Sequence, residues 1–156
     1  MSRKASKVLT QSGVIPYRVE NGKIEVLLIT SRSRQEWVIP KGGIVNGMSP
    51  PDSAAKEAWE EAGVIGEVDV NQLGTYMYGK RGNIYQVQMF LLRVEKVLED
   101  WQEASQRQRQ WLDVNKAIER IEKPSLKQIL EGAFLTKGEN TTRLLELSVQ
   151  LNSRVR

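Results

Sequence analysis

The feature of this sequence that most constrains its fold is a group of glutamates spaced for one face of a helix. Glu57, Glu60 and Glu61 stand at positions i, i+3 and i+4, a spacing that places their carboxylates side by side on an α-helix. Like charges so spaced weaken an isolated helix by roughly 0.2–0.5 kcal/mol per pair. A hard divalent cation would offset this repulsion, because Mg²⁺ binds carboxylate oxygens together with substrate phosphates. The alternative interpretation is a solvated acidic face.

The residues on either side of the glutamates predict the setting of this helix. The apolar run 37–39 ends at a proline and a glycine pair, which predicts a strand followed by a tight loop whose backbone can approach a metal or phosphate. Residues 50–53 are typical of a helix start, with prolines in the first turn and Asp or Ser as the cap. Gly63 stands where the helix should end.

Composition limits the class of protein. The 156 residues are 40% hydrophobic and 27% charged, as in an ordinary soluble protein. They predict a flexible arm over residues 1–10 and a single domain over residues 11–156. No apolar run is long enough to span a membrane, and the N-terminus lacks the apolar stretch of a secretory signal. We therefore expect a cytoplasmic protein with no membrane partner.

The sequence contains neither histidine nor cysteine. This excludes a Ser-His-Asp triad, an imidazole base, a cysteine nucleophile and metal sites built from thiolates or imidazoles. Acid–base chemistry must therefore be carried by Asp, Glu, Lys, Tyr or metal-bound water. The net charge of +4 comes partly from basic residues near the glutamates in the predicted fold, an arrangement that suits a phosphate-rich substrate.

The hydrophobic pattern predicts an α+β (mixed α/β) fold, with a mixed sheet, one helix inserted in mid-chain and others late. Strands are predicted over residues 14–19, 24–30, 37–39, 84–94 and 108–112, and extended chain over 66–78. Further helices are predicted over 114–121, 125–134 and 141–151.

Residues 42–64 resemble the Nudix box, G-x5-E-x7-R-E-U-x-E-E-x-G-U, in which U is apolar. The match comprises Gly42 and the run Glu57-Ala58-Trp59-Glu60-Glu61-Ala62-Gly63-Val64. Met48 replaces the first glutamate, and Lys56 replaces the arginine, which keeps the charge but loses the planar guanidinium. The resemblance implies a Nudix α/β/α sandwich with a mixed central sheet.

The same resemblance implies roles for the site residues. Glu57 and Glu61 would bind Mg²⁺ or Mn²⁺ beside the Gly42 carbonyl, and Glu60 would accept a proton from the attacking water. The spacing of the glutamates supports a cluster of carboxylates but does not show which of them binds the metal and which accepts the proton. Members of the family differ in their general base. The implied enzyme is a pyrophosphohydrolase acting on phosphorus-containing acid anhydrides.

Other stretches are similar to the diphosphoinositol polyphosphate phosphohydrolase subgroup, which also cleaves dinucleoside polyphosphates. They are Ser31-Arg32 before Trp37-Val38-Ile39-Pro40, Val97–Trp101, Arg107-x-Arg109-x-Trp111, Ala117-Ile118 and Lys123-Pro124. The implied partner is a small-molecule polyphosphate. The residues expected to bind it are Ser31, Arg32, Lys41, Gly43, Lys80, Arg81, Arg107, Arg109 and Lys123. Lys41 departs from the glycine common in the subgroup, and Gln11 lies where the subgroup has basic residues.

Two alternative functions stay open from the sequence. Met48 and Lys56 favour a Nudix-fold ligand-binding or regulatory module without catalysis, whereas the retained glutamates argue against it. The other alternative is an RNA-end (cap) pyrophosphohydrolase, in which the basic residues would hold an RNA end; no other nucleic-acid partner and no oligomeric state is predicted. Among the aromatic residues, Trp59, Tyr76, Tyr78 and Tyr85 are expected to pack in the core or the sheet rather than against substrate.

Overall fold

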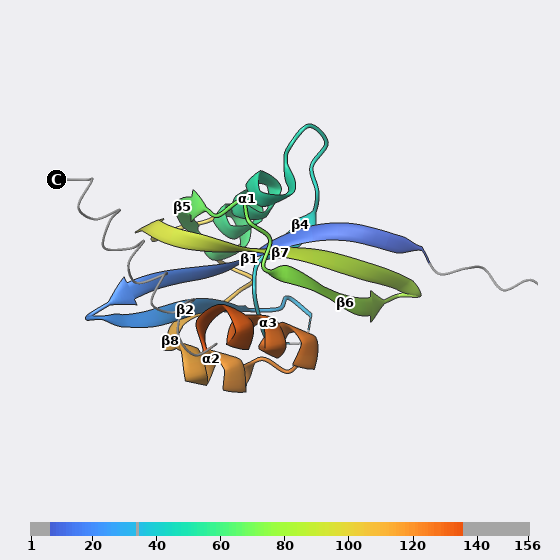
Figure 1. Cartoon of the computed structure of the whole chain (residues 1–156). Helices are drawn as coiled ribbons and strands as arrows, with labels where there is room; N and C mark the ends of the chain where they lie inside the picture. The colour runs from blue at the N-terminus through green and yellow to red at the C-terminus, as the bar shows by residue number, and fades with distance from the viewer. Residues whose placement is uncertain (1–6, 34, 136–156) are drawn as a thin grey trace, which may run out of the picture.

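The computed structural model describes residues 7–33 and 35–135 and contains one mixed β-sheet with helices on both faces (Figure 1). The strands are β1 (Val8–Glu20), β2 (Lys23–Thr30), β3 (Trp37–Val38), β4 (Lys41–Gly43), β5 (Val64–Val68), β6 (Gly74–Lys80), β7 (Asn83–Val97) and β8 (Arg109–Asp113). The helices are α1 (Pro50–Ala62), α2 (Val114–Arg120) and α3 (Pro124–Phe134). Helix α1 covers one face, and α2 and α3 cover the other, which confirms the predicted α/β/α sandwich.

Strand β1 organises the sheet. It pairs antiparallel with β2 through residues 17–20 and with the short β4 through residues 11–13, and it pairs parallel with β7 along residues 8–17. The central strand order is β3-β2-β1-β7-β5. In addition, β6 pairs with β7 and β8 pairs with β2. The pairing with β4 brings Gly42 opposite Ser12, so the glycine pair lies in the sheet beneath α1.

Two hydrophobic clusters form the core, one on each face of the sheet. Neighbouring residues of β1 divide between them, since Val14 belongs to the cluster under α1 and Ile15 to the cluster under α2 and α3. Helix α1 contributes Ala54, Ala58 and Ala62, which are fully buried. These small side chains let the helix lie close to the sheet, and this closeness positions the carboxylates at its edge.

The structure differs from four sequence predictions. The glycine pair, predicted to lie in a tight loop, belongs to β4 because it pairs with β1. Residues 8–10 of the predicted arm belong to β1, because they pair with β7 at residues 84–86; residues 1–6 lie outside the described part. Trp59 was expected in the core, but 46% of its surface is exposed because it lies outside the buried alanine stripe of α1. The predicted extended chain over 66–78 is divided between β5 and β6. The helix predicted over 141–151 lies outside the described residues.

Within the described residues, the structure contains no helix that is both long and apolar enough to cross a membrane.

Candidate active site

Both ends of α1 are fixed by local sequence. The Ser49 hydroxyl accepts a hydrogen bond from the Asp52 amide at 3.2 Å and caps the N-terminus. The cap predicted from the sequence, Asp52 or Ser53, is therefore wrong, because both residues already lie inside the helix. Ser53 instead holds the preceding loop, since its hydroxyl accepts from the Val45 amide and donates to the Gly43 carbonyl. At the other end, Gly63 has a φ of 67° in the left-handed region and ends the helix as predicted.

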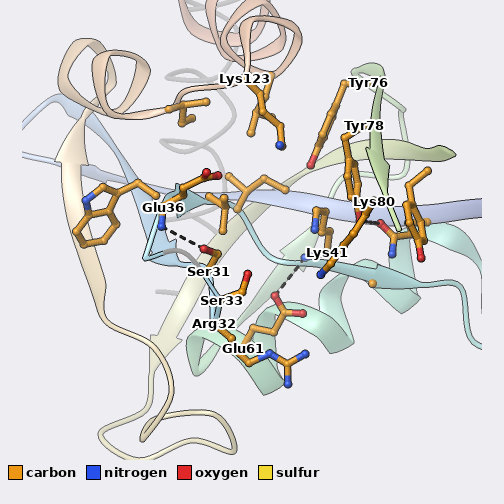
Figure 2. Close-up of a pocket in the computed structure, with 18 of the residues that line it drawn as sticks. Ser31, Arg32, Ser33, Glu36, Lys41, Glu61, Tyr76, Tyr78, Lys80 and Lys123 are labelled. Atoms are coloured by element: carbon orange, nitrogen blue, oxygen red, sulfur yellow. Dashed lines mark hydrogen bonds between the residues drawn. The ribbon is translucent and has the colours of Figure 1, made fainter. Parts of the chain in front are cut away.

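Helix α1 presents Glu57 and Glu61 together against β4. The two carboxyl groups are hydrogen-bonded to each other, and the backbone amide of Lys41 donates to Glu61 Oε1 at 3.4 Å (Figure 2). A Cβ added to Gly42 would overlap the carboxyl carbon of Glu57. Glycine is therefore required at position 42 because the Glu57 carboxyl group occupies the space of a side chain.

Burial sets the charge of this carboxyl pair. Only 6% of the Glu61 surface is exposed. This burial raises the pKa of Glu61 to about 8; the hydrogen bond with Glu57 adds to the effect, and the charge of Arg107 opposes it. Burial also raises the pKa of Glu57. Both shifts favour the protonated form of the pair when no cation is bound, and a bound cation would favour the charged form of both ligands.

The third glutamate of the motif is held apart from this pair. Lys56, four residues earlier on α1, forms an ion pair with the Glu60 carboxylate, and Glu60 does not line the pocket described below. In the described part of the chain, no three acidic side chains gather closely enough to form a ready-made metal site. The structure thus brings together Glu57, Glu61 and Gly42 of the predicted centre, and assigns Glu60 a different partner.

A loop between β7 and β8 supplies a carboxylate that the sequence analysis missed. The Glu103 amide donates to the Glu60 carbonyl at 3.1 Å, and the Glu103 carboxylate pairs with Arg107 Nε at 2.9 Å. Arg107 also reaches Glu61 Oε1 at 3.5 Å and donates to the Thr30 carbonyl at 3.0 Å. Arg107 therefore links the loop, strand β2 and the carboxyl pair, with its charge directed at Glu61.

The carboxyl pair borders a cavity of about 810 Å³. The predicted residues that line it are Ser31, Arg32, Lys41, Gly42, Glu57, Glu61, Lys80, Arg81, Arg107 and Lys123. Gln11, Glu103, Tyr76, Tyr78 and Tyr85 also line it, so these tyrosines face the pocket as well as packing in the sheet. Figure 2 shows Lys41, Lys80 and Lys123 in the part of the pocket that contains Tyr76 and Tyr78. The pocket combines acidic groups on one wall with several cations on the others.

Lys41 is a half-buried member of this group of cations. Its ammonium group lies 4.6 Å from the centre of the Tyr78 ring, and that of Lys123 lies 5.4 Å from the same ring. Burial lowers the pKa of Lys41; Glu61 opposes this effect, whereas Lys80, Lys123 and Arg107 add to it. The crowding of like charges around Lys41 would be relieved by an anionic ligand.

Two predicted phosphate-binding residues lie elsewhere. The Arg109 guanidinium stacks 3.8 Å from the centre of the Trp101 ring and donates to the Ala62 carbonyl at 2.8 Å and to the Leu98 carbonyl. It is therefore used to hold the last turn of α1, where unpaired carbonyls attract a cation. Gly43 is outside the pocket lining, and its carbonyl accepts from Ser53.

Replacing Arg109 by alanine is expected to destabilise the protein by about 3 kcal/mol, from the loss of charged hydrogen bonds and the contact with Trp101. Urea unfolding would measure this, with Arg120→Ala as the control because Arg120 lies more loosely over Trp37, 5.7 Å from the ring centre. If Arg109→Ala had normal stability but a raised KM, Arg109 would be a substrate-binding residue, as predicted from the sequence.

The raised pKa of Glu61 predicts how stability depends on pH. The unfolded carboxyl ionises near 4.5, whereas the folded group keeps its proton until about 8. Folding therefore takes up a proton between these values, and stability falls as pH rises through this window, by at most about 1.4 kcal/mol per pH unit for one proton. Thermal melts in chelator at several pH values would measure the slope, and Glu61→Gln should flatten it. A stability that rose across the window in the wild type would contradict the assignment.

Comparison with known proteins agrees with this geometry. The NUDIX domain profile matches residues 9–132. The chain is 34% identical over 154 residues to Nudix hydrolase 12, mitochondrial, of Arabidopsis thaliana, covering 85% of this chain and 75% of that protein. It is 33% identical over 126 residues to diphosphoinositol polyphosphate phosphohydrolase 2 of Rattus norvegicus, covering 75% and 69% of the two chains.

Among solved structures, the C. elegans Ap4A hydrolase superposes with a TM-score of 0.66 and 25% identity, over 83% of this chain and 99% of that one. The chain therefore belongs to the NUDIX domain family. The predicted enzyme class, a Nudix pyrophosphohydrolase, is confirmed by the family and by relatives named as Nudix hydrolases.

Proposed function

We propose that this enzyme is a metal-dependent hydrolase that cleaves a phosphoanhydride bond in diphosphoinositol polyphosphates or dinucleoside polyphosphates. The observation that carries the proposal is the Glu57–Glu61 pair, in which Glu61 is buried and Glu57 half-buried, at the edge of a cation-lined pocket. The names of two relatives support the substrate class, one acting on diphosphoinositol polyphosphate and one on Ap4A. A cytoplasmic location stays a prediction.

The residues at the carboxyl pair suit Mg²⁺ or Mn²⁺. Glu57 and Glu61 offer the oxygen ligands that these ions prefer, and Gly42 leaves room for a carboxylate against the backbone. The raised pKa of both carboxyl groups marks a place where positive charge is needed. A bound ion would polarise a phosphoryl oxygen and lower the pKa of its water. Glu60 or Glu103 would accept the proton, Glu60 after release from Lys56.

The cations of the pocket would bind the phosphates. Lys41, whose charge interacts with Glu61, would hold the phosphate next to the bond that breaks, while Lys80 and Lys123 would hold the following phosphates. Arg107 is already paired with Glu61 and Glu103, so we expect it to fix the acidic wall and to contribute only long-range attraction. This division favours a substrate with a chain or cluster of several phosphates.

The function is tested by measuring phosphate and nucleotide release from a panel of substrates with Mg²⁺ or Mn²⁺ at mildly alkaline pH. The panel contains diadenosine polyphosphates, a diphosphoinositol polyphosphate, ADP-ribose and a capped RNA. Turnover of either of the first two classes well above the others supports the proposal. Preference for the capped RNA would favour the RNA-end alternative, and a folded protein inactive on the whole panel would favour a binding module.

Replacing Lys123 by alanine is expected to raise KM by about 5-fold at low salt and less at high salt, because an accessible charge contributes modestly and is screened. Steady-state kinetics at two ionic strengths would measure both values. Lys116→Ala is the matched control, since Lys116 lies on α2 and outside the pocket lining. An unchanged KM for Lys123→Ala would reduce this residue to a surface charge.

A further inference from the structure

Ser12 of β1 is a buried hydroxyl with no use in the scheme above. It is completely inaccessible to solvent, and within the described residues its Oγ has no hydrogen-bond partner. Such a group is costly to bury, because it has lost its bonds to water and gained none from the protein. Most buried hydroxyls that lack a partner mark strain, a functional role or a missing ligand.

The strand pairing places Ser12 beside the carboxyl pair. Ser12 is the antiparallel partner of Gly42, and side chains of directly opposed residues lie on the same face, with Cβ atoms roughly 5 Å apart. A Cβ on Gly42 would fall within the Glu57 carboxyl group. The Glu57 carboxyl group therefore occupies the position next to Ser12 on the sheet face covered by α1.

The neighbouring residues leave Ser12 facing this group. Val14, two positions along β1 on the same face, belongs to the apolar cluster under α1, so the surroundings on that side offer no polar atom. Gln88 of β7 is opposite Ser12 in the parallel pairing, but it does not satisfy the hydroxyl. The Glu57 carboxyl group is the polar group that the pairing of Ser12 with Gly42 places next to this hydroxyl.

We propose that Ser12 is a positioning residue for the metal ligand Glu57: when a divalent cation is bound, the Ser12 hydroxyl donates a hydrogen bond to a Glu57 carboxylate oxygen and fixes its orientation. The inference rests on the proposed function, since it requires that Glu57 binds the ion. A ligating carboxylate needs such outer partners, and loss of one weakens metal binding by about 10–100-fold in other sites.

The test measures Mn²⁺ affinity by electron paramagnetic resonance for the wild type and for Ser12→Ala, Ser12→Cys and Thr10→Ala. Thr10→Ala is the matched control, because it removes an exposed hydroxyl from the same strand and face, one pair of residues away. Thermal melts of the metal-free proteins accompany the titrations. We expect Ser12→Ala to weaken Mn²⁺ binding by about 10-fold without lowering the metal-free melting temperature, and Thr10→Ala to bind as the wild type.

Ser12→Cys distinguishes the loss of the hydroxyl hydrogen bond from the loss of side-chain volume. A thiol fills the space but is a weak donor, so this variant should stay weakened if the hydrogen bond matters. Wild-type affinity in Ser12→Ala, full recovery in Ser12→Cys, an equal loss in Thr10→Ala or a lowered metal-free melting temperature in Ser12→Ala would each overturn the inference. A wild-type protein that bound no Mn²⁺ would instead overturn the proposed function.

Discussion

Replacing Glu61 by glutamine is expected to lower metal-dependent turnover by about 10³-fold in a protein that still folds. A metal ion contributes several kcal/mol to stabilising the transition state, and about 4 kcal/mol corresponds to this factor. The amide keeps the size of the side chain and can still accept from the Lys41 amide, but it offers a neutral and weaker ligand. Because Glu61 resists ionisation when buried, the metal-free variant should also be more stable than the wild type above neutral pH.

The matched control is Glu122→Gln, which removes a carboxylate from the exposed rim of the same pocket. Its turnover should stay within a few-fold of the wild type. Initial rates with saturating Mg²⁺ and circular dichroism on the same samples would provide the comparison. Wild-type turnover in Glu61→Gln would remove Glu61 from the metal site.

Replacing Gly42 by alanine is expected to reduce turnover by about 10²-fold or more. The new methyl group would overlap the Glu57 carboxyl group, so either β4 moves or Glu57 leaves its position against the sheet. A misplacement of about 1 Å in a catalytic centre can cost about 10²-fold in rate. Metal titrations and initial rates would measure the effect.

The neighbouring glycine provides an unusually close control, because a Cβ added to Gly43 meets no atom within 4 Å. Gly43→Ala should therefore retain near wild-type turnover and stability. If both alanine variants lost activity equally, the glycine pair would be required for backbone flexibility, and the contact between Gly42 and Glu57 would not explain the requirement at position 42.

The sequence predicted the parts of the site that depend on local spacing. The run from Glu57 to Gly63 defines a helix face and its end. The glycine pair before it was predicted as a tight loop that could approach a metal, whereas it lies in strand β4, against which that face packs. The structure confirms this unit because the close approach of Gly42 to Glu57 is built from segments joined by a short loop. The alanines at i and i+4 spacing also support it, since they set the buried face of α1.

Other parts of the site depend on contacts between distant segments. Glu103 reaches the carboxyl pair only because its loop docks on the last turn of α1, a contact that no local pattern indicates. Arg107 and Arg109 carry the same sequence signal, yet the first contacts Glu61 and the second caps the helix carbonyls. Their roles differ because Arg109 is the first residue of β8, where it pairs with Ile29 of β2, whereas Arg107 lies in the loop before the strand.

Glu60 shows why a motif does not divide roles. Its spacing places it with Glu57 and Glu61, but Lys56 is four residues away on the same helix and is available as a partner. The lysine keeps the charge of the arginine expected at this position and binds the glutamate directly. Whether Glu60 or Glu103 accepts the proton therefore depends on which of them is released toward the pocket when metal and substrate bind.

A metal centre at the Glu57–Glu61 pair is best tested by the hydrolysis of diadenosine hexaphosphate by the wild type and by Glu61→Gln, each with excess Mg²⁺ and with excess chelator. We expect rapid turnover for the wild type with Mg²⁺ and near-background rates in the other three reactions. Wild-type turnover that persisted in chelator, or that survived the Glu61 substitution, would contradict a metal centre at the Glu57–Glu61 pair.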